Sequence, residues 1–391
     1  MTRPDAPGPM ERRGPRPLLL HLMLAAMRSN ASIAALPNLR HVWPHWNATD
    51  SLADPDFAAA VVREALAQDA ALLAGIAAYR RHPWRRTLAD PPAVWAEGSS
   101  RLLDYGGTGP VLFFVPSLVN RAHILDLAED ASFLRFLAAQ GAHPLLLDWG
   151  WPGAIERQFT LTDYVAGRLE RALEAVAGPV VLVGYCMGGL LALAAALRAP
   201  ERIRALALLA TPWDFHAEDE EAARSLATSL PILEPLMAAT GTVPIDALQT
   251  LFATLDPFGV TAKYRAFAAL DPASPRAVRF VALEDWLNDG VPLAAPVARE
   301  TLGGWYGENA TAQGAWRIAG LPVNPAAITC PTLIATPARD RLVPPASAAA
   351  LATVVPHATV IAPKAGHIGM IAGMSAPQAL WQPFGEWVAG L

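Results

Sequence analysis

From about residue 110 onward, the chain alternates short apolar runs with longer stretches whose apolar residues recur every three or four positions. The short runs fit buried strands, and the longer stretches fit helices. Strands that are apolar on both faces and separated by helices form a parallel sheet covered on both sides. The predicted strands are VLFFV at 111–115, HPLLLDWG at 143–150, VVLVGY at 180–185 and IRALALLA at 203–210.

Helices are predicted between these strands. The stretch 122–141 is expected to form one helix that ends at Gly141. A second helix begins at Thr160 or Thr162 and stops at Gly178, because threonine is a good N-cap and glycine a common helix terminator. The pattern therefore predicts an α/β fold with helices on both faces of a mostly parallel sheet.

The strand rhythm lapses between Trp213 and about Gly320, where the sequence is mostly helical with prolines and aromatics. It returns with the strand TLIATPA at 332–338, a helix near 346–354, the strand ATVIAPK at 358–364 and a C-terminal helix. An insertion of this kind commonly forms a cap over an active site. We therefore predict an N-terminal helical or irregular segment at 1–95 and a catalytic domain at 96–391, with a cap insertion at about 213–320.

Composition narrows the classes of protein. The 391 residues are 53% hydrophobic and 17% charged, enough for a large core, and the net charge of −5 gives no basic field for nucleic acid. Two cysteines, Cys186 and Cys330, lack the spacing of a zinc site or a disulfide framework, so we expect no metal and a reduced, cytoplasmic setting.

The basic and apolar N-terminus needs its own interpretation. His21 interrupts the apolar stretch and no clear small-residue cleavage site follows it, so we predict a surface or partner-docking amphipathic helix rather than an export signal. We also predict no transmembrane span, because the apolar runs fall short of the ~20 residues that one needs.

The turn after the third predicted strand carries the chemistry. Gly184-Tyr185-Cys186-Met187-Gly188 has the form of a nucleophile elbow with cysteine in the usual serine place. The two glycines permit a sharp strand-to-helix turn where side chains would collide with backbone. A helix N-terminus favours a thiolate at Cys186, and the N–H of Met187 can bind an oxyanion. The alternative is a small buried cysteine without a chemical role.

The elbow is typical of the α/β-hydrolase fold, which we therefore predict and which needs an acid and then a histidine after later strands. Asp340 follows the strand TLIATPA, and His367 follows ATVIAPK, in the required order. The second oxyanion donor is expected in the loop after the first core strand, from the backbone N–H of Leu118 or Val119, and the sequence leaves these two open. Cys330 has no elbow around it and is predicted to be structural.

With these motifs in place, the chain resembles polyhydroxyalkanoate synthases over residues 100–391, most closely the catalytic chains of the two-subunit, class III type. The similar segments are PSLVNRAHILDL, DWGWPG with FTLTDY, GYCMGG, EDWLNDG to WYGEN, IAGLPVNPAAITCPTL, DRLVPP and GHIGM, in the same order. Two positions depart from the usual pattern: Gly153 replaces an aspartate, and Arg341 replaces a histidine beside the acid.

The resemblance implies an acyltransferase that polymerises 3-hydroxyacyl-CoA and releases coenzyme A. Cys186 would carry the acyl group, His367 would be the general base, and Asp340 its partner. Trp286, Trp305 and Tyr306 of the cap are candidates for lining an acyl channel, with packing of the cap on the core as the alternative.

The same resemblance implies a homodimer on polyester granules in the cytoplasm, with room for a small accessory subunit and no cofactor beyond the coenzyme A that leaves the substrate. Two alternatives remain open at this point. One is a hydrolase with a cysteine nucleophile, such as a thioesterase, esterase or polyester depolymerase, and the other is a non-catalytic granule-associated protein.

Overall fold

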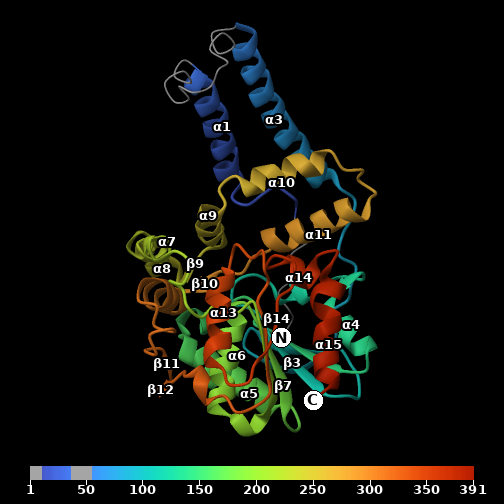
Figure 1. The fold of residues 1–391 in the computed structure, drawn as a ribbon, viewed down its shortest axis with the longest axis vertical. Coiled ribbons are helices and arrows are strands. Elements are labelled where there is room, and N and C mark those ends of the chain that lie inside the picture. Colours follow the sequence, from blue (N-terminus) through green and yellow to red (C-terminus); the bar gives the residue numbers. More distant parts are fainter. Residues whose placement is uncertain (1–10, 37–54) are drawn as a thin grey trace. The chain divides into compact units, whose positions relative to one another are not determined.

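The computed structural model describes residues 11–36 and 55–391 (Figure 1). The chain divides into two compact units, each of which is described here by itself. Unit 1 contains Met1–Arg85 and Gln249–Asn288, and unit 2 contains Arg86–Leu248 and Asp289–Leu391. The predicted domains, 1–95 and 96–391, differ from these units, because residues 249–288 group with the N-terminal segment and not with the predicted catalytic domain.

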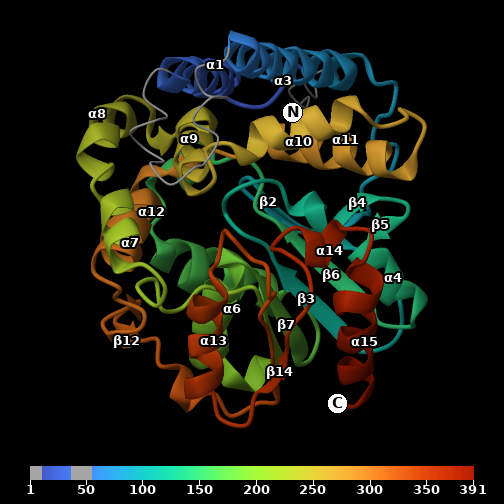
Figure 2. The same ribbon diagram turned by 45° about the horizontal axis from the view of Figure 1, so that its top comes forward.

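Unit 2 is built on an eight-stranded sheet in the order β1-β2-β6-β3-β7-β8-β13-β14, which Figure 2 shows in part. The strands β6, β3, β7, β8, β13 and β14 are parallel, and β1 and β2 extend one edge in antiparallel pairing. The bounds are β1 Ala93–Glu97, β2 Ser100–Asp104, β3 Val111–Val115, β6 His143–Asp148, β7 Val180–Tyr185, β8 Ile203–Leu209, β13 Thr332–Ala335 and β14 Thr359–Ile361.

The strands predicted from apolar runs are confirmed. The core strand β7 is buried at every residue, as a strand covered on both faces must be. The helix predicted to begin at Thr160 or Thr162 is also confirmed, and Thr160 is its cap: the Thr160 hydroxyl accepts from the Asp163 N–H at 3.2 Å, and the Asp163 carboxylate accepts from the Thr160 N–H at 2.8 Å.

The single helix predicted at 122–141 is wrong. This stretch forms a one-turn 3-10 helix, η3 (Ala122–Leu125), then a small hairpin of β4 (Asp126–Ala128) and β5 (Ala131–Ser132), and only then α4 (Phe133–Ala139). The cause is Asp126, whose side chain is fully buried against two arginines and which therefore belongs to a fixed turn rather than to a helix surface.

Helices cover both faces of the sheet in unit 2. On one side, Phe133 of α4 and Phe384 of α15 (Gln382–Ala389) pack on Phe114 of β3, with ring centroids 5.7 and 6.4 Å away. The other side carries α5 (Glu170–Glu174), α6 (Met187–Arg198) and α13 (Pro345–Val354), as Figure 1 shows. The further short elements on the sheet are η4 (Glu156–Gln158), the π-helix η5 (Asp163–Leu169), η6 (Pro200–Arg202), η8 (Pro325–Ala327), α14 (Gly369–Ala372) and η9 (Pro377–Trp381).

The segment 213–320 is mostly helical, as predicted, with two small strand pairings, β9 with β10 and β11 with β12, inserted or adjoining. Its elements are α7 (Glu220–Ala227), α8 (Leu230–Thr240), β9 (Thr242–Val243), α9 (Ile245–Leu255), α10 (Gly259–Ala268), α11 (Pro275–Asn288), β10 (Leu293–Ala294), α12 (Ala295–Arg299), η7 (Glu300–Gly307) and β11 (Arg317–Ile318), followed by β12 (Leu321–Pro322). Only the part outside 249–288 belongs to unit 2.

Unit 1 packs α1 (Leu18–Ala35) and α3 (Pro55–Arg81) with α10 and α11. Leu72, Ile76 and Tyr79 of α3 meet Tyr264 and other apolar residues of the 249–288 segment in one buried cluster. The helices α3 and α10 approach so closely that a Cβ added at Gly75 would lie 2.0 Å from the carbonyl oxygen of Tyr264.

Helix α1 is long and apolar enough to cross a membrane by length and composition, with a mean hydropathy of 1.3 over 18 residues. The sequence analysis predicted no transmembrane span and did not recognise an apolar helix of this length. A signal sequence and the core helix of a soluble protein can have the same length and composition, and 17% of this window of α1 is buried.

Candidate active site

Cys186 sits on a strained turn between β7 and α6. Its backbone φ of 56° and ψ of −130° lie outside the regions that side-chain-bearing residues favour, and its N–H donates to the carbonyl of Leu209 at 2.9 Å. Glycines make the turn possible: a Cβ at Gly184 would lie 2.4 Å from the Cα of Gly189, and one at Gly188 would lie 2.1 Å from the carbonyl oxygen of Val115. The sequence therefore forces the thiol to the carboxyl edge of the sheet.

Asp340 and His367 meet at the same edge. The Asp340 Oδ2 lies 2.7 Å from Nδ1 of His367, and both side chains are buried. The other Asp340 oxygen, Oδ1, accepts from the N–H groups of Leu342 at 2.8 Å and Val343 at 2.9 Å. This carboxylate is therefore fully engaged and fixes the orientation of the imidazole, leaving Nε2 of His367 for Cys186.

The electrostatics of His367 link it to Cys186. Burial acts to lower the pKa of His367, but the charge of Cys186, hydrogen bonds to Asp340 and Cys186 and the charge of Asp340 together raise that pKa to about 10. The three residues that the sequence singled out from distant segments thus form one hydrogen-bonded group. Their catalytic roles stay a prediction.

Tyr185 is a further member of this group that sequence reasoning missed. Its ring lies 5.1 Å from the His367 ring, centroid to centroid, and its hydroxyl donates to the His367 carbonyl at 3.3 Å. Its position directly before Cys186, in a wholly buried strand, is the signal that could have drawn attention to it.

The structure distinguishes the two candidates for the second oxyanion donor. The Val119 N–H donates to the hydroxyl of Ser117 at 3.1 Å. For the N–H of Leu118, no hydrogen-bond partner is found among residues 11–36 and 55–391. Met187, the first residue of α6, has an N–H that no carbonyl within its helix can reach. The N–H of Leu118, unpaired within those ranges, and the helix-start N–H of Met187 favour these two residues over Val119, and their binding of an oxyanion stays a prediction.

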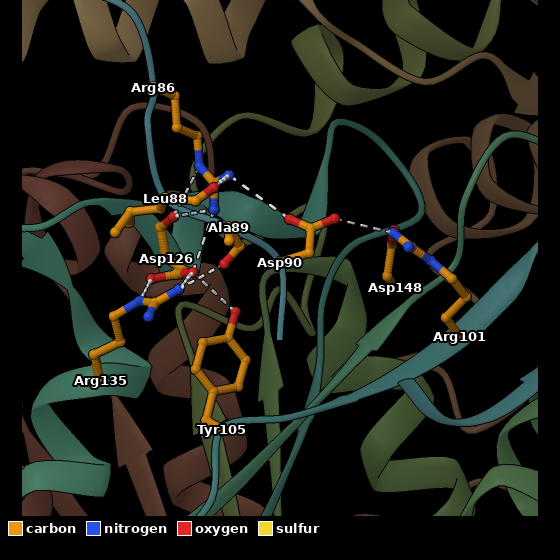
Figure 3. A network of polar contacts seen from close by, with 9 residues as sticks. All are labelled: Arg86, Leu88, Ala89, Asp90, Arg101, Tyr105, Asp126, Arg135 and Asp148. Carbon is orange, nitrogen blue, oxygen red and sulfur yellow. Dashed lines mark hydrogen bonds and ion pairs between the residues drawn. The ribbon is translucent and has the colours of Figure 1, made fainter. Parts of the chain in front are cut away.

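A polar network centred on the buried Asp126 anchors the loop that holds Leu118 (Figure 3). Asp126, at the far end of this loop, is fully buried and is paired with Arg135 at 2.8 Å and Arg86 at 3.2 Å, and it accepts from the Tyr105 hydroxyl at 3.2 Å. Arg86 continues the network to Asp90 at 3.7 Å, close to the point where the chain enters unit 2. Removing one partner from such a buried ion group leaves an uncompensated charge, so the network resists distortion of the loop.

The start of the same loop is held separately. The indole N–H of Trp149 donates to the carbonyl of Pro116 at 3.0 Å. Sequence reasoning did not identify Asp126 or Trp149, because their contacts join different elements: Arg86 lies 40 residues before Asp126, and Pro116 lies 33 residues before Trp149.

Tyr306 and Trp305, predicted to line an acyl channel, lie on η7 in unit 2. The Tyr306 ring meets Phe215 at 4.8 Å, and its carbonyl accepts from Nε2 of His216 at 2.8 Å. Burial, and after it the charge of Cys186, raises the pKa of Tyr306 to about 12, which places this phenol within electrostatic reach of the thiol. Trp305 is buried and stacks on Phe215, so packing accounts for much of its environment.

Trp286, the third predicted lining residue, is a buried residue of α11 and belongs to unit 1. Its role in binding substrate stays a prediction. Within the part of the chain that the structure describes, no group of three or more His, Cys, Asp or Glu side chains is arranged to hold a metal ion.

The parallel sheet, the elbow and the hydrogen-bonded Cys-His-Asp group define a protein of the alpha/beta hydrolase class, and the alpha/beta hydrolase fold family matches residues 157–373. Among solved structures, an epoxide hydrolase from Bacillus megaterium shares this fold with a TM-score of 0.50 at 14% identity, over 77% of this chain and all of that one.

Sequence relatives are more specific. The poly(3-hydroxyalkanoate) polymerase subunit PhaC of Allochromatium vinosum is 30% identical over 71% of this chain and 80% of its own length. The subunit of the same name from Synechocystis is 28% identical over 72% of this chain and 77% of its own length. The chain belongs to the PhaC family of poly(3-hydroxyalkanoate) polymerases, which are acyltransferase enzymes.

Proposed function

We propose that this enzyme polymerises 3-hydroxyacyl-CoA through an acyl-cysteine intermediate on Cys186 and releases coenzyme A. The observation that supports this most directly is the strained turn that presents Cys186 to a histidine already oriented by a buried aspartate. The similarity to PhaC polymerase subunits supports the polymerase activity, and the mechanism below rests on the geometry of this site.

In the first step, the Cys186 thiolate attacks the carbonyl carbon of the substrate thioester. The N–H groups of Leu118 and Met187 stabilise the negative charge on the carbonyl oxygen, and one such donor typically contributes ~3 kcal/mol to the transition state. The carbon–sulfur bond to coenzyme A then breaks, and protonated His367 gives its proton to the departing thiolate. The raised pKa of His367 keeps that proton available at neutral pH.

In the second step, the 3-hydroxyl of another acyl unit attacks the acyl-cysteine. Neutral His367 takes the hydroxyl proton, the new ester bond forms, and the Cys186 thiolate leaves. We assign this proton transfer to His367 rather than to Asp340, because both oxygens of Asp340 already accept hydrogen bonds. Exchange of one thioester for another is close to thermoneutral, so the intermediate stays reactive toward an alcohol.

We extend the proposal to the setting of the reaction. The product is a water-insoluble polyester, and we expect the enzyme to act as a homodimer on its granules in the cytoplasm, with or without a small accessory subunit. No cofactor is required in this scheme, since coenzyme A enters and leaves with the substrate.

The test is to incubate the purified protein with 3-hydroxybutyryl-CoA, follow thiol release, and analyse the acyl product by mass spectrometry, with Cys186→Ala in parallel. Oligomeric ester that disappears in the variant is the expected result. Free 3-hydroxybutyrate as the sole product would overturn the proposal in favour of a hydrolase. Polymer formation that survives in the variant would overturn the acyl-cysteine step.

A further inference from the structure

The loops that carry Asp340 and His367 run side by side beyond the ends of β13 and β14. The N–H of Arg339 donates to the carbonyl of Ala365 at 3.0 Å, and the N–H of Ala338 donates to the carbonyl of Pro363 at 2.9 Å. The residue before the buried aspartate and the segment before the buried histidine are thereby held next to each other.

Each of these loops presents a cation to solvent. Arg339 directly precedes Asp340, Lys364 lies three residues before His367, and both side chains are exposed. Neither has a side-chain hydrogen bond or ion pair anywhere in the described ranges 11–36 and 55–391. The carboxylate nearest in sequence, Asp340, points inward to His367 and to backbone N–H groups, so it is not available to them.

These two cations differ from many arginines of unit 2 in lacking a carboxylate partner among the described residues. The protein carries a net charge of −5, and several other arginines of unit 2, such as Arg101 and Arg135, are paired with carboxylates. A local excess of cations that the protein does not neutralise favours a multiply charged anion.

Arg339 and Lys364 form a rim of exposed positive charge that lies within reach of the Cys186 thiol. The N–H of Cys186 bonds to Leu209 at the end of β8, and the N–H of Ala210 bonds to Ala335 at the end of β13, each at 2.9 Å. Two strand spacings therefore separate the elbow from the strand that leads to Arg339, which is about 10 Å. A thioester substrate on an extended arm can place its acyl end at Cys186 and its far end at this rim.

We propose that Arg339 and Lys364 bind the phosphate groups of the acyl-CoA substrate. This inference rests on the proposed function for the identity of the substrate. The diphosphate and the phosphate monoester of coenzyme A supply the anionic oxygens, and the two side chains supply charge-assisted hydrogen bonds. The site thus recognises the nucleotide end of the substrate on the same two loops that position the acid and the base.

Binding is measured first with coenzyme A itself, by calorimetry, on Cys186→Ala protein so that no acyl transfer occurs. The further substitutions R339A and K364A, made together in this protein, are expected to weaken its affinity for coenzyme A about tenfold or more. The matched control is Arg204→Ala: Arg204 is an exposed arginine near the start of β8, at the opposite end of the parallel strands, and its removal is expected to leave the affinity unchanged. Equal affinity in the double variant and the control would overturn the inference.

Kinetics then separate this site from the chemistry. With an otherwise active enzyme, R339A together with K364A should raise the KM for 3-hydroxybutyryl-CoA about tenfold. The KM for the N-acetylcysteamine thioester of 3-hydroxybutyrate, which has no phosphate, should not change, and kcat should not change for either thioester. A parallel loss with both thioesters would overturn the phosphate assignment.

The inference and the proposed function fail in different ways. If the wild-type protein forms no ester, but the double variant binds coenzyme A more weakly than the wild type does, polymerisation is refuted and the phosphate site stands. Wild-type protein that forms polyester, with the double variant unchanged in both assays, would refute the phosphate site alone.

Discussion

The two cysteines of this chain lie at opposite ends of parallel strands, and their surroundings differ in ways that affect the reactivity of each thiol. Cys186 follows β7 at the carboxyl edge, on a turn with positive φ, in hydrogen-bond contact with His367. Cys330 precedes β13 at the amino edge, and its carbonyl accepts from the Thr332 hydroxyl at 3.0 Å. Burial raises the pKa of the Cys330 thiol, which disfavours its reactive thiolate.

The comparison shows that position in the fold decides what a cysteine can do. In open parallel sheets, the loops at the carboxyl ends of strands converge on the site, and the acid and base here come from the ends of β13 and β14. A thiol at the amino edge has no such partners. Each of the following predictions either removes this difference or measures it.

Exchange of the nucleophile should have the largest effect. Cys186→Ala is expected to lower the rate of coenzyme A release by roughly 10⁵-fold, because the covalent intermediate cannot form. Cys330→Ala, the matched control, should change the rate less than about twofold. Thiol release from 3-hydroxybutyryl-CoA measures both. A large loss in Cys330→Ala with the fold intact by circular dichroism would contradict the contrast between the two edges.

Removal of the charge on Asp340 should make Cys186 less reactive and so reduce its difference from Cys330, which has no oriented histidine beside it. Asp340→Asn keeps the size of the side chain but replaces one acceptor with a donor, so the imidazole loses its orientation. We expect kcat to fall about a thousandfold with little change in KM. A steady-state comparison with the wild type decides this, and a loss of less than about tenfold would show that His367 is oriented without the carboxylate.

Gly188→Ala tests the turn itself. The added Cβ would lie 2.1 Å from the carbonyl oxygen of Val115, in backbone that cannot step aside, so the elbow and the loop that holds Leu118 must separate. A misplacement of about 1 Å is expected to lower kcat about a hundredfold. As a control, Gly304→Ala introduces a Cβ with no atom within 4 Å and should leave activity and unfolding temperature nearly unchanged. Wild-type kcat in Gly188→Ala would contradict the close approach.

The smallest expected effect is a shift in the pKa of His367. The folded pKa of His367 is raised to about 10 from 6.5, so its contribution to stability is present in full below pH 6.5 and is lost as the pH rises through about 10. Cys186→Ala removes the charge that does most to raise this pKa, so the His367 pKa should fall, whereas Cys330→Ala should leave it unchanged. Nitrogen-15 NMR of the imidazole gives both values. Equal pKa values in the two variants would mean that the thiol and the imidazole are not coupled.

Sequence predicted the parts of this molecule that have a local signature. The core strands are apolar runs, and the elbow, Asp340 and His367 follow from glycine spacing and chain order, so a one-dimensional pattern locates them. The sequence did not predict the hairpin at 126–132, because this hairpin depends on the buried Asp126, whose partners Arg86 and Arg135 lie on other elements. Nor could the sequence separate Leu118 from Val119, since that choice depends on where the Ser117 hydroxyl points.

The discontinuity of unit 1 has an evolutionary consequence. Its buried cluster joins residues of the first 85 positions to residues of 249–288, and Gly75 has no room for a side chain against Tyr264. Either segment without the other would expose an apolar face and raise its risk of aggregation. We therefore expect the N-terminal segment and the insertion to be inherited as one unit, so that relatives gain, lose or exchange them together.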